Sequence, residues 1–252
     1  MKDLRAVTPL ILSLNDEDGH VVKNAYHALK KFGHEIVPNL LPFYSHKNKN
    51  IREKIHELII GFGEPIVPTL RKELDTHQWV VGNRIVHTIW EIGKSKEENT
   101  LITCLSHRHA QKTVIILLGS LKSISAIPHF IRMYQKPNLR RVIFYAIRLI
   151  GKESAFPVII HALNNSALSV SAEMMIIKVG PSMLPFLVKE LAKGVVNRQI
   201  IVTLITRIGP DSVRGELIAL AEKNKDIAAV TKEIRRNMQT KSDVSKKNFG
   251  LF

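Results

Sequence analysis

Apolar residues recur along this chain at offsets of three, four and seven positions, which is the spacing of one buried stripe on an α-helix. In the segment that ends at Gly151, for example, Ile143, Ile147 and Ile150 fall on one side of such a helix, and Arg148 falls on the other. No comparable stretch alternates with a period of two. The pattern therefore predicts helices rather than strands.

The helical stripe repeats every 29 or 30 residues, and most copies end in an apolar residue followed by glycine. A glycine directly after the last turn is typical of a left-handed C-terminal cap. In the fourth copy, Leu121 and Lys122 occupy these two positions. The apolar–glycine pairs are Phe32-Gly33, Phe62-Gly63, Ile92-Gly93, Ile150-Gly151, Val179-Gly180 and Ile208-Gly209.

A proline recurs five or six residues after most of these glycines, and it predicts the start of another helix. Proline fits a first helical turn because that turn needs no backbone donor. A second apolar stripe follows, as at Leu187 and Leu191. Each unit is thus a pair of helices that cannot bury its stripes alone, so neighbouring units must stack around one continuous core. The prolines are Pro38, Pro68, Pro128, Pro157 and Pro185.

The repeats predict an all-α fold, an α–α superhelix of about eight helical hairpins. We expect one solenoid over residues 1–238 and a flexible basic C-terminal tail over 239–252. The eighth unit keeps Val230 and Ile234 on its stripe but has Glu233 and Asn237 where apolar residues stood before, as a polar capping repeat should. The units are expected to end near residues 33, 63, 93, 122, 151, 180, 209 and 238.

This pattern resembles the short HEAT repeats known as phycobilisome-lyase-type HEAT-like repeats. The marks of the resemblance are an apolar–glycine helix end, a proline in the following helix, and an apolar–basic pair opening the second helix, here Val22-Lys23, Ile51-Arg52 and Leu139-Arg140. The resemblance covers roughly residues 4–238. It implies a HEAT/armadillo-type solenoid whose second helices line a concave surface. It implies no single function, since such repeats occur in scaffolds, assembly factors, lyase subunits and DNA-repair enzymes.

The side of each second helix opposite its apolar stripe is the candidate contact surface. We call it the contact row, and it comprises the positions ten, six and three residues before the glycine. From the third to the sixth unit it mixes large apolar and aromatic groups with Lys and Arg, and such groups aligned on an exposed face usually mark a binding surface. The alternative is that tight curvature buries Ile116, Met174 and Ile177 between repeats. The expected partner-binding residues are His87, Trp90, Lys112, Ile116, Arg141, Tyr145, Arg148, Met174 and Ile177.

The net charge of +15 is concentrated in the middle of the chain. Residues 1–98 carry 14 Lys/Arg against 13 Asp/Glu, whereas residues 99–210 carry 14 against 3. A block this basic attracts anionic partners, although it can also serve solubility alone. The candidate anion-binding residues are Arg108, Lys112, Arg140, Arg141, Arg148 and Arg198.

Basic residues also open most of the second helices. In HEAT families the matching arginine often bonds an Asp in the preceding turn, and Asp18 precedes Lys23 in this way. Later turns offer Asn138 and Asn165 instead. Because asparagine leaves the cation uncompensated, each of these basic residues is either part of a structural ladder or a phosphate contact.

No catalytic, cofactor-binding or metal-binding constellation stands out, and neither a Walker loop nor a Rossmann fingerprint occurs. The pairs His34-Glu35 and His56-Glu57 resemble the iron-binding pairs of HEAT-repeat hydroxylases, but they occupy different positions in their units and should not converge. A single cysteine, Cys104, excludes an intramolecular disulfide and fits a reducing compartment. The apolar runs are shorter than the roughly 20 residues that span a bilayer. We therefore expect no cofactor, no membrane insertion and a cytoplasmic location.

These features favour a non-enzymatic binding scaffold or assembly factor that holds a protein partner, an acidic one, on the contact row. The alternative is a nucleic-acid-binding protein that uses the basic block of residues 99–210. The mixture of Trp90, Tyr145, Arg141 and Arg148 suits either an acidic peptide helix or a nucleic-acid backbone with stacked bases. A weaker alternative, implied by the resemblance alone, is a bilin-lyase-like or chaperone subunit.

Overall fold

The structure is a computed structural model that describes residues 3–74 and 79–209 and, after these, only 215, 217–219, 228 and 232. The expected tail and most of the expected eighth unit lie outside the described residues. Every regular element in the described part is helical, which confirms the predicted all-α fold. The chain divides into two compact units, which we describe separately: unit 1 is residues 1–123 and unit 2 is residues 124–252.

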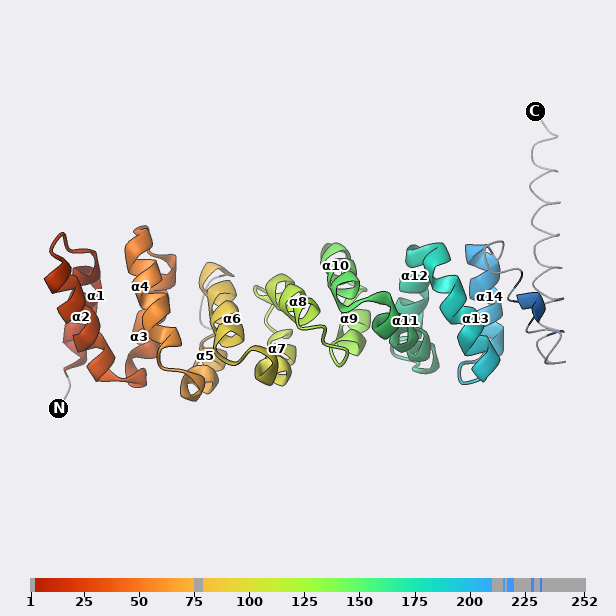
Figure 1. Ribbon diagram of the computed structural model, residues 1–252, viewed down its shortest axis with the longest axis horizontal. Helices are drawn as coiled ribbons and strands as arrows, with labels where there is room; N and C mark the ends of the chain where they lie inside the picture. Colours follow the sequence, from red (N-terminus) through yellow and green to blue (C-terminus); the bar gives the residue numbers. More distant parts are fainter. Residues whose placement is uncertain are drawn as a thin grey trace, which may run out of the picture. The chain divides into compact units, whose positions relative to one another are not determined.

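Unit 1 consists of successive helix pairs in which the first helix contacts the second (Figure 1). The second helices also contact one another in chain order, and 3₁₀ turns (η) extend or precede several of the first helices. The first helices and their turns are η1 (Leu4–Ala6), α1 (Val7–Leu12), η2 (Ser13–Asn15), η3 (His34–Ile36), α3 (Val37–Leu40), η4 (Leu41–Ser45), η5 (Glu64–Ile66), α5 (Val67–Glu73), η6 (Lys94–Glu97) and α7 (Glu98–Cys104). The second helices are α2 (Gly19–Phe32), α4 (Lys49–Ile60), α6 (Trp79–Gly93) and α8 (Gln111–Ser120).

Unit 2 is built in the same way. Its first helices contact one another in chain order, and both α10 and α12 pack against α9 and α11. The first helices and the associated turns are α9 (Ile127–Met133), η7 (Pro137–Leu139), α11 (Lys152–His161), η8 (Ala162–Asn164), η9 (Gly180–Met183) and α13 (Leu184–Lys193). The second helices are α10 (Arg140–Ile150), α12 (Ser169–Val179) and α14 (Arg198–Ile208).

The stripe of the second helices forms the core of each unit. In all seven described repeats, the residues eight and four positions before the glycine position are buried, whereas the residue directly before it is mostly half-buried at the helix end. The residue five positions before the glycine position is also buried in six of these repeats, at Leu58, Thr88, Leu117, Ala146, Met175 and Leu204. The residues at the two fully buried positions are Ala25, Ile55, Ile85, Val114, Ile143, Ala172 and Ile201, and Leu29, Ile59, Ile89, Leu118, Ile147, Ile176 and Ile205.

Gly33, Gly151, Gly180 and Gly209 directly follow a second helix and have positive φ; Gly63 also has positive φ, but α4 ends at Ile60 and its C-cap is Gly61 with φ of −63°. Lys122, which takes the glycine position in the fourth repeat, adopts the same kind of conformation with φ of 54°.

Gly93 differs from the other repeat glycines. It is the last residue of α6, and η6 follows it directly. A Cβ atom at this position would collide with the side chain of Glu97. The space that Glu97 occupies, rather than a left-handed cap, therefore explains this glycine.

Pro157 also departs from the expected position in a first turn. It lies inside α11, because that helix begins directly after Gly151, five residues before the proline. The prolines of α3, α5, α9 and α13 do lie in the first turn.

One helical stretch of the described residues, Ser169–Lys193, is long and apolar enough to cross a membrane by length and composition. It comprises α12, η9 and α13 and is interrupted by Gly180, whose φ is 71°. Met175, Leu187 and Leu191 from this stretch are buried in the core of unit 2. Packing between helices thus accounts for part of the apolar character of the stretch, while Val170 and Met174 of α12 remain exposed.

A carboxylate is buried between the first helices of unit 2. The side chain of Glu190 in α13 is only 2% exposed, and its two oxygens lie 2.8 Å from Nε2 of His161 and 2.6 Å from Nζ of Lys193. Burial raises the pKa of Glu190, but the hydrogen bonds and charges of Lys193 and His161 outweigh burial and hold the pKa below its usual value. The bond from His161 joins α11 to α13.

The cysteine at the end of α7 belongs to the core of unit 1. Cys104 is 1% exposed, and burial raises the pKa of its thiol to about 11. This side chain therefore packs as a small apolar group and is not a nucleophile near neutral pH.

Candidate functional site

In unit 1, the contact row runs along α6 and α8. His87 is exposed on α6, and desolvation by its neighbours lowers its pKa, reinforced by the charges of His56 and Arg84 and opposed by Glu91. On α8, Lys112 is exposed and the side chain of Ile116 is 38% exposed. These three side chains are therefore accessible to a partner.

Trp90 is the fourth expected contact residue of unit 1. Unlike the other three, it is not exposed but half-buried. Its indole Nε1 is buried and has no hydrogen-bond partner among the described residues. Part of the ring thus forms the wall between helices, and part remains on the surface. The sequence pattern could not separate these two roles. Trp90 lies three positions before Gly93, and this position is at the edge of the exposed face of the helix.

In unit 2, α10 presents the cationic and aromatic part of the contact row. Arg141, Tyr145 and Arg148 follow one another at offsets of four and three, so they share a helix face, and all three are exposed. Tyr145 is 51% exposed. Neither Arg141 nor Arg148 forms an ion pair with any described carboxylate. Their charges are accordingly available to an anionic partner.

On α12, the contact row is apolar. Val170 is 64% exposed and Met174 is 38% exposed, while Ile177 is half-buried. Glu173 of the same helix is paired: its carboxylate lies 4.0 Å from the guanidinium of Arg207 in α14. Tight curvature does not bury Met174 within unit 2, and it does not bury Ile116 within unit 1.

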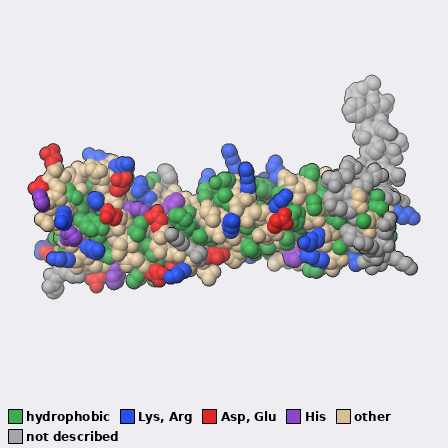
Figure 2. All heavy atoms as spheres, in the orientation of Figure 1, with side chains coloured by type: hydrophobic (Ala, Val, Ile, Leu, Met, Phe, Trp, Pro, Cys, Tyr) green, Lys and Arg blue, Asp and Glu red, His purple; other side chains and the backbone are tan. Residues whose placement is uncertain are grey.

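The face shown in Figure 2 displays the uneven charge. Acidic side chains appear among basic ones over α2 and α4, whereas hydrophobic and Lys/Arg side chains predominate over α10 and α12. Because α10 and α12 pack against the same two helices, α9 and α11, they are neighbours in unit 2.

The basic residues that open the second helices differ from the free cations of α10. Nε of Arg140 donates to the carbonyl oxygen of Tyr134 at 3.1 Å, and its guanidinium lies 5.3 Å from the centre of the Tyr134 ring. Arg52 likewise donates to the carbonyl oxygens of His46 and Lys47, at 2.7 and 2.9 Å. In both repeats the guanidinium caps the carbonyls at the end of the preceding helix, where cations are favoured.

From the sequence we expected Arg140 to bind an anion, but in the structure its guanidinium contacts the end of the preceding helix. Arg198, the first residue of α14, is half-buried beside Gly194, the C-cap of α13, in a related position. Arg108 is exposed in the connection between α7 and α8. The anion-binding candidates thus separate into exposed ones (Arg108, Lys112, Arg141 and Arg148) and ones set against a helix end (Arg140 and Arg198).

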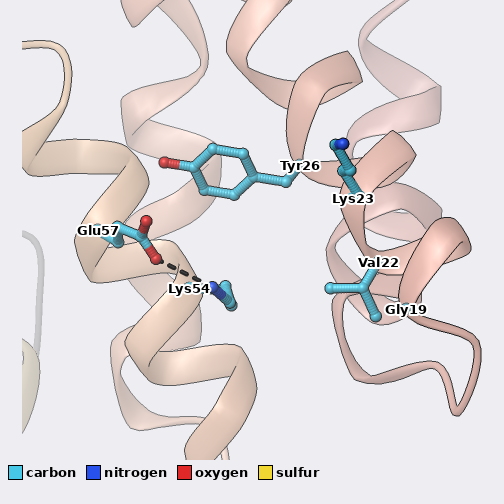
Figure 3. A pocket seen from close by; sticks show the side chains of 6 residues that line it. All are labelled: Gly19, Val22, Lys23, Tyr26, Lys54 and Glu57. Atoms are coloured by element: carbon cyan, nitrogen blue, oxygen red, sulfur yellow. Dashed lines mark hydrogen bonds and ion pairs between the residues drawn. The ribbon is translucent and has the colours of Figure 1, made fainter.

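A hollow of about 280 Å³ between α2 and α4 was not anticipated from the sequence. Figure 3 shows the ring of Tyr26 reaching from α2 toward α4, and Lys54 and Glu57 facing it from α4. Nζ of Lys54 lies 3.1 Å from Glu57 and 5.9 Å from the centre of the Tyr26 ring. Gly19, Val22 and Lys23 of α2 complete the lining.

The chemistry of this hollow is mixed. Burial raises the pKa of Tyr26, and the charge of Glu57 adds to this effect while Lys54 opposes it. A second hollow of about 420 Å³ shares Val22, Lys54 and Glu57. Lys54 and Glu57 satisfy each other, and the further charged residues that line the hollows, Lys23 in the first and Asp16 and Glu53 in the second, are of both signs.

Among the described residues, no group of three or more His, Cys, Asp or Glu side chains is arranged to bind a metal ion. The two His-Glu pairs of the sequence do not meet: His56 bonds instead to Glu91 of the next repeat, with Nε2 and Oε2 2.9 Å apart. This contact between α4 and α6 was not predicted, since it depends on how neighbouring repeats are rotated against each other.

No family model matches this chain, and a search of the curated proteins found no match. The contact row and the hollows are therefore interpreted from their own geometry.

Proposed function

We propose that the chain is a HEAT-like repeat solenoid that acts as a non-enzymatic binding scaffold. Three features support the solenoid: the stacking of consecutive helix pairs within each unit, the common buried stripe, and helix ends repeated every 29 or 30 residues. A solenoid is longer than a globule, so its radius of gyration in small-angle scattering should clearly exceed the roughly 18 Å of a compact domain of this length. A value near that figure would rule the solenoid out.

The partner is a protein with an acidic surface, held on the contact row. The observation that carries this proposal is the pairing, on α10, of an exposed aromatic side chain with two free guanidinium groups. Exposed Tyr and Arg are typical of binding hot spots, because a rigid ring buries area at little entropic cost and a planar guanidinium binds carboxylates in a bidentate manner. Val170 and Met174 of α12 add an apolar area of the kind that a partner covers.

The test is the affinity of a fluorescent amphipathic peptide with leucines at helical spacing and glutamates elsewhere. We expect Arg141→Glu together with Arg148→Glu to weaken binding at least about tenfold, since it replaces attraction by repulsion. Tyr145→Ala should weaken it about three- to tenfold. The matched control is Arg132→Glu together with Lys189→Glu, which changes the charge equally at exposed positions on the first helices α9 and α13.

Equal loss in both double variants would show attraction by bulk charge and would contradict a defined surface. Undiminished binding in the α10 variant would remove the contact row from the function.

Nucleic-acid binding is the second candidate, and the charge pattern favours it specifically. No acidic residue lies between Glu98 and Glu153, and Arg108, Lys112, Arg141 and Arg148 in or next to this stretch are exposed. Within unit 2, Arg141 and Arg148 share a face of α10 and can contact a phosphate backbone, with Tyr145 available for base stacking. A single-stranded oligonucleotide that binds at 50 mM salt, in competition with the peptide, would support this candidate over the first.

A further inference from the structure

In unit 1, the second helices of the later repeats each turn one face toward the repeat before them. This face comprises the positions two, five, nine and twelve residues before the glycine position. Side chains at the first three positions bond to the preceding repeat. The bonds join Glu91 to His56 at 2.9 Å, Thr88 to Tyr44 at 2.8 Å and Thr113 to Asn83 at 2.8 Å. At the fourth position the residues are apolar and buried, and they are Ile51, Val81 and Ala110.

In the first repeat the same face has no neighbour in the described part of unit 1. The second repeat packs against the other side of α1 and α2 (Figure 1). The four positions of α2 are occupied by Val21, Asn24, Ala28 and Lys31, and we call these residues the end face. Val21 is 38% exposed, Asn24 and Lys31 are exposed, and Ala28 is half-buried.

The first helix of this repeat adds apolar residues on the same side. Ala6 and Leu10 correspond to Ile36 and Leu40 of the second repeat, which are fully buried. In the first repeat, by contrast, Ala6 is exposed and Leu10 is half-buried, because no earlier helix pair covers them there. A repeat that faces water at the end of a solenoid normally has a polar outer side. The apolar residues here are instead those of a repeat that is covered by a neighbour.

Charges of opposite sign lie at the two ends of α2. Asp16, Glu17 and Asp18 precede its first residue, Lys30 and Lys31 lie in its last turn, and all five are exposed. Neither Glu17 nor Lys31 forms an ion pair with any described residue. This order of charges favours the helix itself through its dipole. It also makes the end face complementary to an identical face that runs in the opposite direction.

We infer that the end face binds the end face of a second copy of this chain, with the two α2 helices antiparallel about a two-fold axis. Glu17, Val21, Asn24, Ala28 and Lys31 follow one another at spacings of four, three, four and three residues, as in the seam between two paired helices. An axis beside Asn24 places Glu17 opposite Lys31 of the second copy. Val21 then lies opposite Ala28, whose small side chain lets the helices approach closely.

The same axis brings the two copies of Asn24 together. An amide side chain both donates and accepts, so the two can bond to each other. A single polar residue within an apolar seam fixes the register of the helices, because any shift leaves it unpaired.

A second copy fits this face better than a partner with charge of one sign. Such a partner would be attracted by one end of α2 and repelled by the other. The face involves only two short helices, so we expect a weak dimer with a Kd of about 1–100 μM. The inference concerns a surface other than the contact row and does not rest on the proposed function.

Sedimentation velocity of the full chain measures the association. The wild-type protein should pass from monomer to dimer as its concentration is raised from about 1 to about 100 μM. Val21→Asp should raise the Kd at least about tenfold, since it sets two unpaired carboxylates in the apolar centre of the seam. Val21 is partly exposed, so the fold should tolerate the change, and urea unfolding of the variant checks this.

Reversing the charges tests the antiparallel arrangement. Glu17→Lys or Lys31→Glu alone places like charges opposite each other at two points of the dimer and should weaken it about tenfold. The two substitutions in one chain restore opposite charges at both points, so the Kd should return to within about threefold of the wild-type value. An equimolar mixture of the two single variants should form heterodimers for the same reason.

The matched control is Glu35→Lys together with Lys47→Glu, which makes the same changes of charge at exposed positions of the second repeat. It should leave dimerisation unchanged.

A wild-type chain that stays monomeric at about 100 μM would overturn the inference and leave the end face to a different partner. A dimer that persists in Val21→Asp would place the association on another surface. A double variant of Glu17 and Lys31 that binds no better than either single variant would contradict the antiparallel pairing. Because the substitutions in α10 leave the end face intact, loss of peptide binding and loss of dimerisation can be observed separately.

Discussion

Lys122 adopts a left-handed conformation that costs an L-residue about 1–2 kcal/mol. The corresponding position in five other repeats is a glycine with positive φ. Lys122→Gly should therefore stabilise the protein by about 0.5–1 kcal/mol, after allowance for the greater entropy of glycine in the unfolded chain. Urea unfolding measures the change.

The matched control is Lys136→Gly, since Lys136 is exposed and has an ordinary φ of −80°. There the substitution should destabilise by about 0.5–1 kcal/mol. A loss of stability at both positions would mean that the side chain of Lys122 contributes more than its backbone costs.

Glu190 should make unit 2 sensitive to acid. Because its pKa is lowered in the folded protein, the unfolded chain binds more protons than the native state as the pH falls. The stability that Glu190 contributes is thus complete above its unfolded pKa of about 4.5 and is lost as the pH falls through its lower folded value. Glu190→Gln should cost about 1.5–3 kcal/mol at pH 7 and flatten the acid limb of the stability profile.

The control for Glu190 is Glu173→Gln, which removes the partly exposed pair with Arg207 and should cost less than about 1 kcal/mol. Thermal unfolding between pH 3 and 7 distinguishes the two. An unchanged acid limb in Glu190→Gln would show that other carboxylates govern acid unfolding.

At the scale of the helix, α10 has two faces with separate tasks. Ile147 is 3% exposed in the core, while the adjacent Arg148 is exposed on the contact row. Ile147→Ala should cost about 2–4 kcal/mol through lost burial and the cavity that remains. Arg148→Ala should change stability by less than about 0.5 kcal/mol, while it weakens the binding of an acidic peptide. Comparable effects of both on stability would mean that Arg148 is packed rather than free.

The buried stripe of each second helix was predictable because two signals agree within the helix: the spacing of its apolar residues and the glycine at its end. Ile143 and Ile147 are buried and Arg141 and Tyr145 exposed, as the offsets indicated. What could not be predicted depends on neighbouring elements. Arg140 donates to the backbone carbonyl oxygen of Tyr134. Every residue has such a carbonyl, so the residue types do not indicate which one a side chain will contact.

The same limit applies to contacts between repeats. His56 meets Glu91, and Tyr26 faces Lys54, only because adjacent second helices are set at a particular rotation and rise. A spacing of 29 or 30 residues predicts that the helices are neighbours, but it leaves that rotation open. The hollow between α2 and α4 and the contact between His56 and Glu91 arise from this detail.

For the whole molecule, the net charge of +15 makes salt the most direct discriminator between the candidate partners. Between 50 and 200 mM salt, an acidic peptide held partly by apolar contacts should lose less than about tenfold in affinity. An oligonucleotide that engages about six cations should lose on the order of 10³-fold. Fluorescence anisotropy of both probes over this range measures the two slopes. A steep slope for the peptide would argue that charge alone holds it.

The thiol of Cys104 is the single cysteine of the sequence, and it lies almost wholly inside unit 1. A thiol-specific reagent can reach it only in molecules that have opened. When reclosing is fast compared with the reagent, the labelling rate relative to the urea-unfolded chain reports the fraction open. Native protein should therefore label at least about 10³-fold more slowly, given ordinary domain stability. The natural thiol of Cys104 therefore reports the opening of unit 1, and no reporter group has to be engineered into the protein.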